Sequence, residues 1–147
     1  MKRFFYFDTS ALAKRYAQER GSERIDLLLA EAENIIVIGN IAVTELYSAL
    51  SKKLRTHEIS EPTFLAAIYS FEKDIAESKY RFLEIDNDII TASKTLILAY
   101  PGLRTYDALH LALALQLAEL DPIVVSGDGM LLTTAASEGM EILNPEQ

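Results

Sequence analysis

The chain has no cysteine, no long apolar run and no stretch rich in proline, glycine or serine. Without cysteine it forms neither disulfides nor thiolate zinc sites, and it has no cysteine nucleophile. No segment approaches the roughly 20 apolar residues that a membrane-spanning helix needs. The apolar run at 4–7 is too short for a secretion signal, because Asp8 ends it. We therefore expect a soluble, cytoplasmic protein without a membrane segment.

Basic residues are also scarce, since 14 Lys and Arg stand against 22 Asp and Glu and the net charge is −8. This balance argues against general electrostatic binding of nucleic acid, although a net charge does not locate the charges. Half of the 147 residues are hydrophobic, and no repeat divides the chain. We therefore expect a single domain over 1–147 with a substantial core.

Short β-branched or aromatic runs alternate along the chain with segments of helical periodicity. Strands are expected at 4–7, 35–38, 81–85, 123–126 and 140–143. Helices are expected at 10–32 with a break near 21–22 capped by Ser22, and at 41–55, 61–79, 87–100, 105–120 and 130–137. This alternation predicts parallel βαβ units, and so an α/β fold: a three-layer α/β/α sandwich around a short, mainly parallel sheet.

Four acidic residues interrupt or end apolar segments: Asp8, Glu45, Asp107 and Asp128. Asp8 and Asp128 each follow an expected strand, at the edge where parallel sheets of α/β proteins bind ligands. Burying an unpaired carboxylate costs several kcal/mol, or raises its pKa until the group is neutral. If the four converge they need a shared counter-charge, and the natural candidate is a hard divalent cation held by oxygen ligands.

Individual acids also have simpler structural roles. Asp107 lies in the first turn of an expected helix, where the helix dipole favours a negative charge. Glu45 could be an ordinary acid near the start of its helix. Asp86 also follows a strand, but the next helix makes it an expected N-cap and not a site residue. His110, one turn after Asp107, is expected to be a packed, hydrogen-bonded core residue.

Small hydroxyl side chains accompany two of the acids. Thr9 and Ser10 follow Asp8 directly, and Ser126 comes two residues before Asp128. We expect these hydroxyls to orient a carboxylate or a metal-bound water, while Thr9 or Ser10 could also cap the first helix. No Ser-His-Asp arrangement is evident, and no glycine-rich loop with the lysine of a phosphate-binding loop is present.

Taken together, these motifs resemble those of the PIN-domain family. The resemblance rests on the segments 7–12, 44–46, 106–112 and 126–128, which follow in order, and it extends over essentially the whole chain. In length and in the absence of added domains, the chain is most similar to the VapC-type toxins of toxin–antitoxin pairs. The resemblance implies a PIN-like fold and an endoribonuclease that hydrolyses RNA phosphodiester bonds with one or two Mg²⁺ or Mn²⁺ ions.

The resemblance also assigns roles to residues by their position in the motifs. Asp8, Glu45 and Asp107 would be the principal catalytic and metal-binding acids, and Asp128 a more variable fourth, farthest from the metal. The supporting residues would be Thr9, Ser10 and Ser126. Because the chain is acidic overall, RNA binding would depend on a local basic patch or on a dimer groove, for which the candidate residues are Lys14, Arg15, Lys52 and Arg104. The similarity to VapC-type toxins further implies a cognate antitoxin and a homodimer.

Two functions other than that of a ribonuclease are also compatible with the sequence. One is a Mg²⁺-dependent phosphatase of another α/β fold. Such enzymes typically have a second aspartate two residues after the nucleophilic one, where this chain has Ser10. The other is a non-catalytic interaction module, in which the acids are structural and no Mg²⁺ or Mn²⁺ is bound. The aromatic-rich stretch at 64–71 fits either an interface or ordinary core packing.

Overall fold

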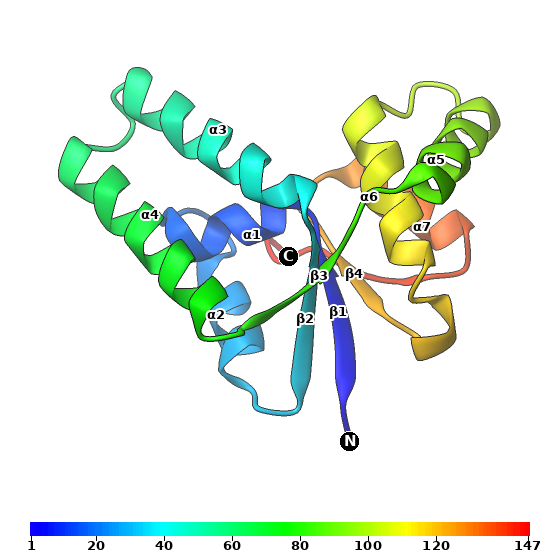
Figure 1. Ribbon diagram of the computed structural model, residues 1–147, viewed down its shortest axis with the longest axis horizontal. Coiled ribbons are helices and arrows are strands. Elements are labelled where there is room, and N and C mark those ends of the chain that lie inside the picture. Colours follow the sequence, from blue (N-terminus) through cyan, green and yellow to red (C-terminus); the bar gives the residue numbers. More distant parts are fainter.

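The computed structural model describes all 147 residues and places a five-stranded sheet between two layers of helices (Figure 1). The strands are β1 (Arg3–Phe7), β2 (Asn34–Gly39), β3 (Tyr80–Leu83), β4 (Ile123–Val125) and β5 (Glu141–Leu143). The α-helices are α1 (Thr9–Tyr16), α2 (Ser22–Ala30), α3 (Ile41–Arg55), α4 (Glu61–Ala76), α5 (Asn87–Ala99), α6 (Thr105–Leu115) and α7 (Gly129–Ser137). A short 3₁₀ helix, η1 (Ala118–Leu120), follows α6. No helix is both long and apolar enough to cross a membrane.

The strands lie in the order β3-β2-β1-β4-β5, and every neighbouring pair is parallel. The predicted α/β fold, a three-layer sandwich with a short parallel sheet, is therefore confirmed. At the end of the central strand, Phe7 is in register with Ile38 of β2 and Val125 of β4. The carboxyl ends of these three strands thus meet at one edge of the sheet, where Asp8 begins the next segment.

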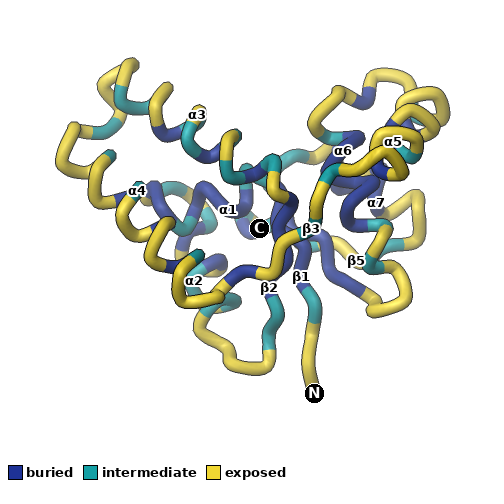
Figure 2. Tube along the Cα trace, viewed as in Figure 1, coloured by how far each residue is buried: buried dark blue, intermediate teal, exposed yellow.

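Alternation along β1 divides the core into two clusters. Phe5 and Phe7 point toward helices α1 to α4, whereas Tyr6 points toward α5 to α7. Figure 1 shows these two groups of helices on opposite sides of the sheet. Figure 2 shows that burial is concentrated in the central strands and the helix faces turned toward them, while the outer ends of α3 and α4 are exposed. The sheet is therefore covered on both faces, as parallel sheets normally are.

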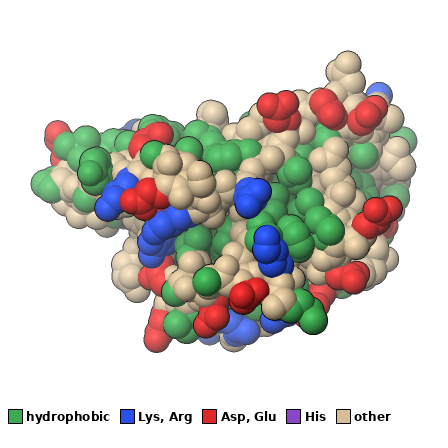
Figure 3. Space-filling view, turned by 60° about the horizontal axis from the view of Figure 1, so that its bottom comes forward, with side chains coloured by type: hydrophobic (Ala, Val, Ile, Leu, Met, Phe, Trp, Pro, Cys, Tyr) green, Lys and Arg blue, Asp and Glu red, His purple; other side chains and the backbone are tan.

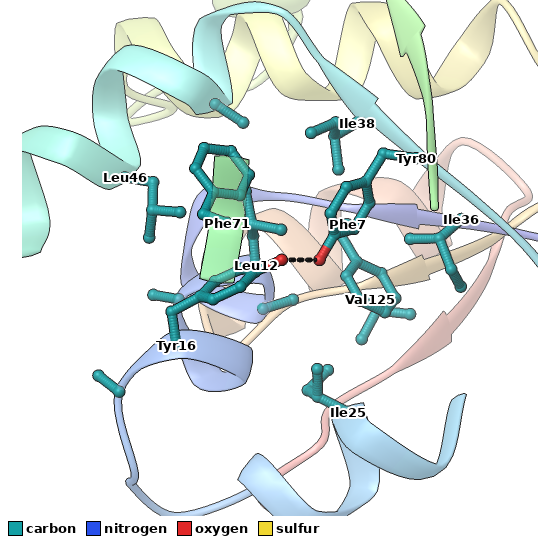
Figure 4. Packing of buried hydrophobic residues seen from close by; sticks show 14 of the residues in the cluster. Phe7, Leu12, Tyr16, Ile25, Ile36, Ile38, Leu46, Phe71, Tyr80 and Val125 are labelled. Atoms are coloured by element: carbon teal, nitrogen blue, oxygen red, sulfur yellow. Dashed lines mark hydrogen bonds between the residues drawn. The ribbon is translucent and has the colours of Figure 1, made fainter. Parts of the chain in front are cut away.

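Aromatic packing joins three elements on the α1–α4 side (Figure 4). Phe71 of α4 packs edge-on against Tyr16 of α1 and Tyr80 of β3, with ring centroids 5.1 and 6.2 Å apart. The hydroxyls of Tyr16 and Tyr80 form a 2.6 Å hydrogen bond. The aromatic-rich stretch of α4 is thus divided, because Phe71 is in the core while Leu65 and Tyr69 are 57% and 71% exposed.

Two predicted helices end earlier than expected. The helix predicted over 10–32 is interrupted where expected, since α2 begins at Ser22, but the break is longer than predicted because α1 already ends at Tyr16. Ser22 is not the N-cap of α2, because its hydroxyl accepts the Glu19 N–H and donates to the Ala17 carbonyl, which closes the intervening turn. The helix predicted over 105–120 ends at Leu115, because from Gln116 on the backbone N–H groups bond to carbonyls three residues earlier, and the chain then forms η1 before Pro122.

Candidate active site at the carboxyl edge of the sheet

β1 delivers Asp8 to the junction where the strand ends and α1 begins. Asp8 is itself the N-cap of α1, because its Oδ1 accepts the backbone N–H of Ala11 at 3.0 Å. The N-cap of the first helix is therefore Asp8, and not Thr9 or Ser10 as the sequence suggested. The side chain is buried, with 4% of the residue exposed. Burial raises the pKa of the Asp8 carboxyl, although the hydrogen bonds that it accepts act in the opposite direction.

Two serines hold Asp8 and connect it to the end of β4. Ser10 Oγ donates to Oδ1 at 2.7 Å, and Ser126 Oγ donates to Oδ2 at 2.6 Å. The same serine oxygens accept backbone N–H groups, Ser10 from Gly127 at 2.9 Å and Ser126 from Asp128 at 2.8 Å. The segments that follow β1 and β4 are therefore tied together through Asp8.

Asp128 is the N-cap of α7, as Asp8 is of α1. Its Oδ1 accepts the backbone N–H groups of Met130 at 2.9 Å and Leu131 at 3.3 Å. Its Oδ2 lies 3.6 Å from the guanidinium of Arg104. The capping bonds fix the orientation of this side chain despite the glycine on either side of it.

Glu45 lies in the second turn of α3 and is held through one oxygen only. Its Oε1 accepts a hydrogen bond from Thr9 Oγ1 at 2.7 Å and lies 2.8 Å from His110 Nε2. The other ring nitrogen of His110 is 2.7 Å from the hydroxyl of Tyr6, and both residues are buried. Burial acts to raise the pKa of Glu45, but the contacts with His110 and Thr9 outweigh it and lower that pKa.

One arrangement of protons satisfies this chain of contacts. Burial, followed by the charges of Asp8 and Glu45, raises the pKa of Tyr6 well above its usual value, so the phenol keeps its proton. With Nδ1 of His110 as the acceptor of the phenol, the N–H on Nε2 of the same ring donates to Oε1 of Glu45. Oε2 of Glu45 makes no hydrogen bond and remains open to a ligand.

The role of His110 was missed by the sequence prediction. The residue is buried and hydrogen-bonded, as predicted for a core histidine. Its partner, however, is the candidate acid Glu45, 65 positions away in the sequence. No local signal could have revealed this pair, because the contact exists only when α3 and α6 meet beyond the end of the sheet.

Asp107 is the acid whose charge is least compensated. It lies in the first turn of α6, and its Oδ2 is buried without any hydrogen-bond partner. The nearest cation is Arg104, whose Nε is 4.0 Å away and whose side chain is 82% exposed. Burial, together with the charge of Asp128 and then that of Asp8, raises the pKa of Asp107 to about 6. Helix-dipole stabilisation alone does not explain an acid buried with an unpartnered oxygen.

The donor set fits a divalent cation. The four acids offer hard oxygen ligands of the kind that Mg²⁺ and Mn²⁺ take. Asp107 Oδ2 and Glu45 Oε2 have no protein donor, so a cation could bind them without breaking a hydrogen bond. No three Asp, Glu or His side chains surround a common point closely enough to form a finished metal site. Side-chain adjustment would therefore accompany cation binding.

The four candidate RNA-binding residues do not share one surface. Lys14 is 5% exposed, and its amine is paired with two glutamates at 3.0 and 3.1 Å. Arg15 is paired with an aspartate of α2 at 3.0 Å. Their predicted RNA contacts do not fit this placement, because both charges are already neutralised by acidic partners. Lys52 and Arg104 are exposed.

Asp86 shows what an ordinary acid at a strand end looks like. Its Oδ1 accepts the backbone N–H of Ile89 at 2.9 Å, and it is the N-cap of α5, as predicted. It makes no other side-chain hydrogen bond. The distinction between Asp86 and Asp8 therefore lies in the surrounding serines and in burial, and not in the capping role that they share.

The sequence model of the PIN domain family matches residues 5–137. This chain belongs to the PIN-domain family. A phosphatase of another α/β fold is thereby excluded. The comparison with curated proteins found no match.

Solved structures share the fold of this PIN domain at low sequence identity. PAE2754 from Pyrobaculum aerophilum is 18% identical with a TM-score of 0.66, over 99% of this chain and 90% of that chain. VapC20 of Mycobacterium tuberculosis, a Sarcin-Ricin loop cleaving toxin, is 14% identical with a TM-score of 0.66, over 92% and 95%. A toxin–antitoxin complex from Klebsiella pneumoniae is 20% identical with a TM-score of 0.56, over 96% and 97%. The chain is thus structurally similar to VapC-type toxins.

Proposed function

We propose that this PIN domain is a metal-dependent endoribonuclease that hydrolyses RNA phosphodiester bonds. The observation that carries the proposal is the buried, unpartnered Oδ2 of Asp107, which experiences the like charges of Asp128 and Asp8. Such an arrangement is unfavourable unless a cation completes it. PIN domains are typically nucleases, and hydrolysis of a phosphodiester is chemistry that a divalent cation on carboxylates supports.

Under this proposal Asp8, Glu45 and Asp107 hold Mg²⁺ or Mn²⁺, as one or two ions, and Asp128 is the fourth acid. When bound, the metal would lower the pKa of the attacking water and offset negative charge on the phosphate. The protein's part is to keep its carboxylates oriented before the substrate arrives.

Hydrogen bonds from neighbouring side chains provide that orientation. Ser10 and Ser126 each donate to a different oxygen of Asp8, so the carboxylate plane is fixed. Thr9 and His110 engage only Oε1 of Glu45 and leave Oε2 without a hydrogen bond, so that it could accept a ligand. Residues that orient metal ligands in this way typically change metal affinity or activity by 10- to 100-fold when removed.

The biological role that we propose is that of the toxin of a toxin–antitoxin pair, acting in the cytoplasm as a homodimer and as a single nuclease domain over 1–147. Support comes from the structural likeness to VapC20 and to a toxin–antitoxin complex. Co-expression with a small protein encoded directly upstream of the gene should suppress RNA cleavage. Undiminished cleavage in the presence of that protein would argue for a nuclease outside such a pair.

An RNA-cleavage assay with Mg²⁺ or Mn²⁺ tests the enzymatic proposal. Asp8→Asn should reduce the cleavage rate by about 100-fold or more, since replacing a metal ligand should cost at least as much as removing the residues that orient it. Asp86→Asn is the matched control, because Asp86 also follows a strand and caps a helix. It should cleave at the wild-type rate.

Two results would reject the enzymatic proposal. One is full activity of Asp8→Asn, and the other is cleavage that persists undiminished in a chelator. Binding of neither Mg²⁺ nor Mn²⁺, measured by calorimetry on the wild-type protein, would instead favour a non-catalytic interaction module.

A further inference from the structure

A groove of about 630 Å³ opens beside the candidate active site. One wall is α3, which contributes residues at successive turns from Ile41 and Glu45 to Lys52, and the opposite wall is Tyr106 of α6. Thr9 and Glu45 line the groove and also belong to the hydrogen-bonded network of the candidate active site. The groove is therefore continuous with the acids and is not a separate depression.

Tyr106 gives this groove an aromatic surface. It directly precedes Asp107, is 56% exposed and makes no side-chain hydrogen bond. Ile41 and Ala49 add apolar surface from α3. An exposed ring above apolar side chains suits a planar ligand, and nucleic-acid bases stack on such rings with little regard to sequence.

Lys52 gives the groove a positive charge at its other end. It lies seven residues after Glu45, which corresponds to about 10 Å along the helix. Its amine makes no salt bridge, whereas the neighbouring Lys53 lies 3.5 Å from Glu19. Figure 3 shows the molecule with the amino-end side of the strands turned forward, away from the groove, and basic and acidic side chains are interspersed on that face. An unpaired lysine in a groove that leads to the acids suits an anionic backbone.

We propose that this groove binds the nucleotide next to the scissile phosphate of a single-stranded RNA, with its base stacked on Tyr106 and a neighbouring phosphate paired with Lys52. A base must leave its own stack to reach the ring, so paired RNA is excluded. The exposed hydroxyls of Thr44 and Ser48 line the same wall and offer hydrogen bonds to ribose or phosphate. The inference rests on the proposed nuclease function and adds Tyr106 as the residue on which the base beside the scissile bond stacks.

Binding of a short fluorescent single-stranded RNA, followed by anisotropy in Mg²⁺, tests this inference. The parent protein carries Asp8→Asn, so that the RNA survives the measurement. Adding Tyr106→Ala should weaken binding by about 10-fold or more, the usual loss for a stacked base, while Tyr106→Phe should retain it. Adding Lys52→Ala should weaken binding and reduce the salt dependence by about one counterion. A duplex of the same sequence should bind more weakly and should not respond to Tyr106→Ala.

Two matched variants control for surface changes in general. Tyr69→Ala removes an exposed tyrosine of α4, and Lys94→Ala removes an exposed lysine of α5, and neither residue lines the groove. Both should bind RNA like the parent. Equal binding by the parent and Tyr106→Ala, or an equal loss with Tyr69→Ala, would overturn the inference. So would a Tyr106→Ala protein that binds RNA normally but changes its mass in light scattering, since the groove would then be a protein contact.

The same measurements separate the groove from the nuclease proposal. If RNA binding depends on Tyr106 but the wild-type protein never cleaves RNA, the groove proposal is supported and the nuclease proposal is rejected. If cleavage depends on metal but RNA binding does not depend on Tyr106, the nuclease proposal is supported and the groove proposal is rejected.

Discussion

The charges of Asp74 and Asp107, two largely buried aspartates, are compensated to very different extents. Asp74 of α4 is 5% exposed and accepts a 2.6 Å hydrogen bond from the hydroxyl of Tyr16. Lys79 lies 3.4 Å and Arg15 3.6 Å from its oxygens. Asp107 has a buried oxygen with no donor, and its only nearby cation is an exposed arginine at 4.0 Å.

The difference separates a structural acid from a candidate functional one. The protein surrounds Asp74 with its own donors and cations, so this charge joins α1, α4 and the region of β3 and needs nothing from outside. Around Asp107 the neighbours include two further acids, which makes the metal-free arrangement unfavourable. A charge that the fold leaves uncompensated indicates a binding site for a cation. Asp74→Asn and Asp107→Asn can test whether the two charges differ in this way.

The largest effect on stability is expected at Asp74. Asp74→Asn should lower the free energy of unfolding by about 3 kcal/mol, because it removes a buried charge whose donor and cationic partners remain in place. Urea denaturation monitored by circular dichroism would measure the change. RNA cleavage per folded molecule should be unaffected. A variant as stable as the wild type would show that the Asp74 cluster does not hold the fold together.

The opposite sign is expected at Asp107 in the metal-free protein. Asp107→Asn should raise the free energy of unfolding at pH 7.5 by about 2 kcal/mol, since a carboxyl pKa of about 6 lies well above the unfolded value near 4 and each pKa unit corresponds to about 1.4 kcal/mol. This free-energy change is smaller than the full pKa shift would give, because 14% of the Asp107 side chain is exposed and solvent screens its charge.

The pH dependence gives this expectation a second test. A raised carboxyl pKa means that the folded state binds the proton more tightly than the unfolded state does. The wild-type protein therefore loses stability relative to Asp107→Asn as the pH rises from about 4 to about 6, and below about 4 the difference disappears. Chemical denaturation in a chelator over this range measures the difference. A gap that is constant with pH would contradict the uncompensated charge.

The smallest of these effects is the response to metal. Mg²⁺ at tenfold its dissociation constant should stabilise the wild-type protein by about 1.4 kcal/mol through mass action. Asp74→Asn should gain the same stability from Mg²⁺, although its stability without metal is lower. Asp107→Asn should gain little or none. Thermal unfolding with and without Mg²⁺ measures the increments. An equal response from wild type and Asp107→Asn would place the metal elsewhere.

Local patterns in the sequence were sufficient for the architecture and for part of the site. Alternating short apolar runs and helical periodicity predicted the parallel three-layer fold, and the positions of Asp8 and Asp128 after strands predicted that they would reach the same edge. Asp86 was correctly separated as a helix cap. These predictions succeeded because strand ends, caps and periodicity are properties of neighbouring residues.

Predictions that depended on which segments meet were less successful. Lys14 looks like an exposed base in a helix, but it is buried between two glutamates, one of which lies 132 positions away. His110 looks like a core histidine, but it orients Glu45 across 65 positions. Ser22 looks like a helix cap, but it closes the turn before α2. In each case the partner, and not the residue type, decides the role.

The sequence by itself determined that four acids would stand in apolar surroundings and that at least two would follow parallel strands. Only the tertiary structure decided how each charge is compensated, by serines at Asp8, by threonine and histidine at Glu45, by helix N–H groups at Asp128, and by no donor at one oxygen of Asp107. The physical reason is that burial follows from local hydrophobicity, whereas compensation of a buried charge requires a partner, and in a parallel α/β fold most partners come from distant segments.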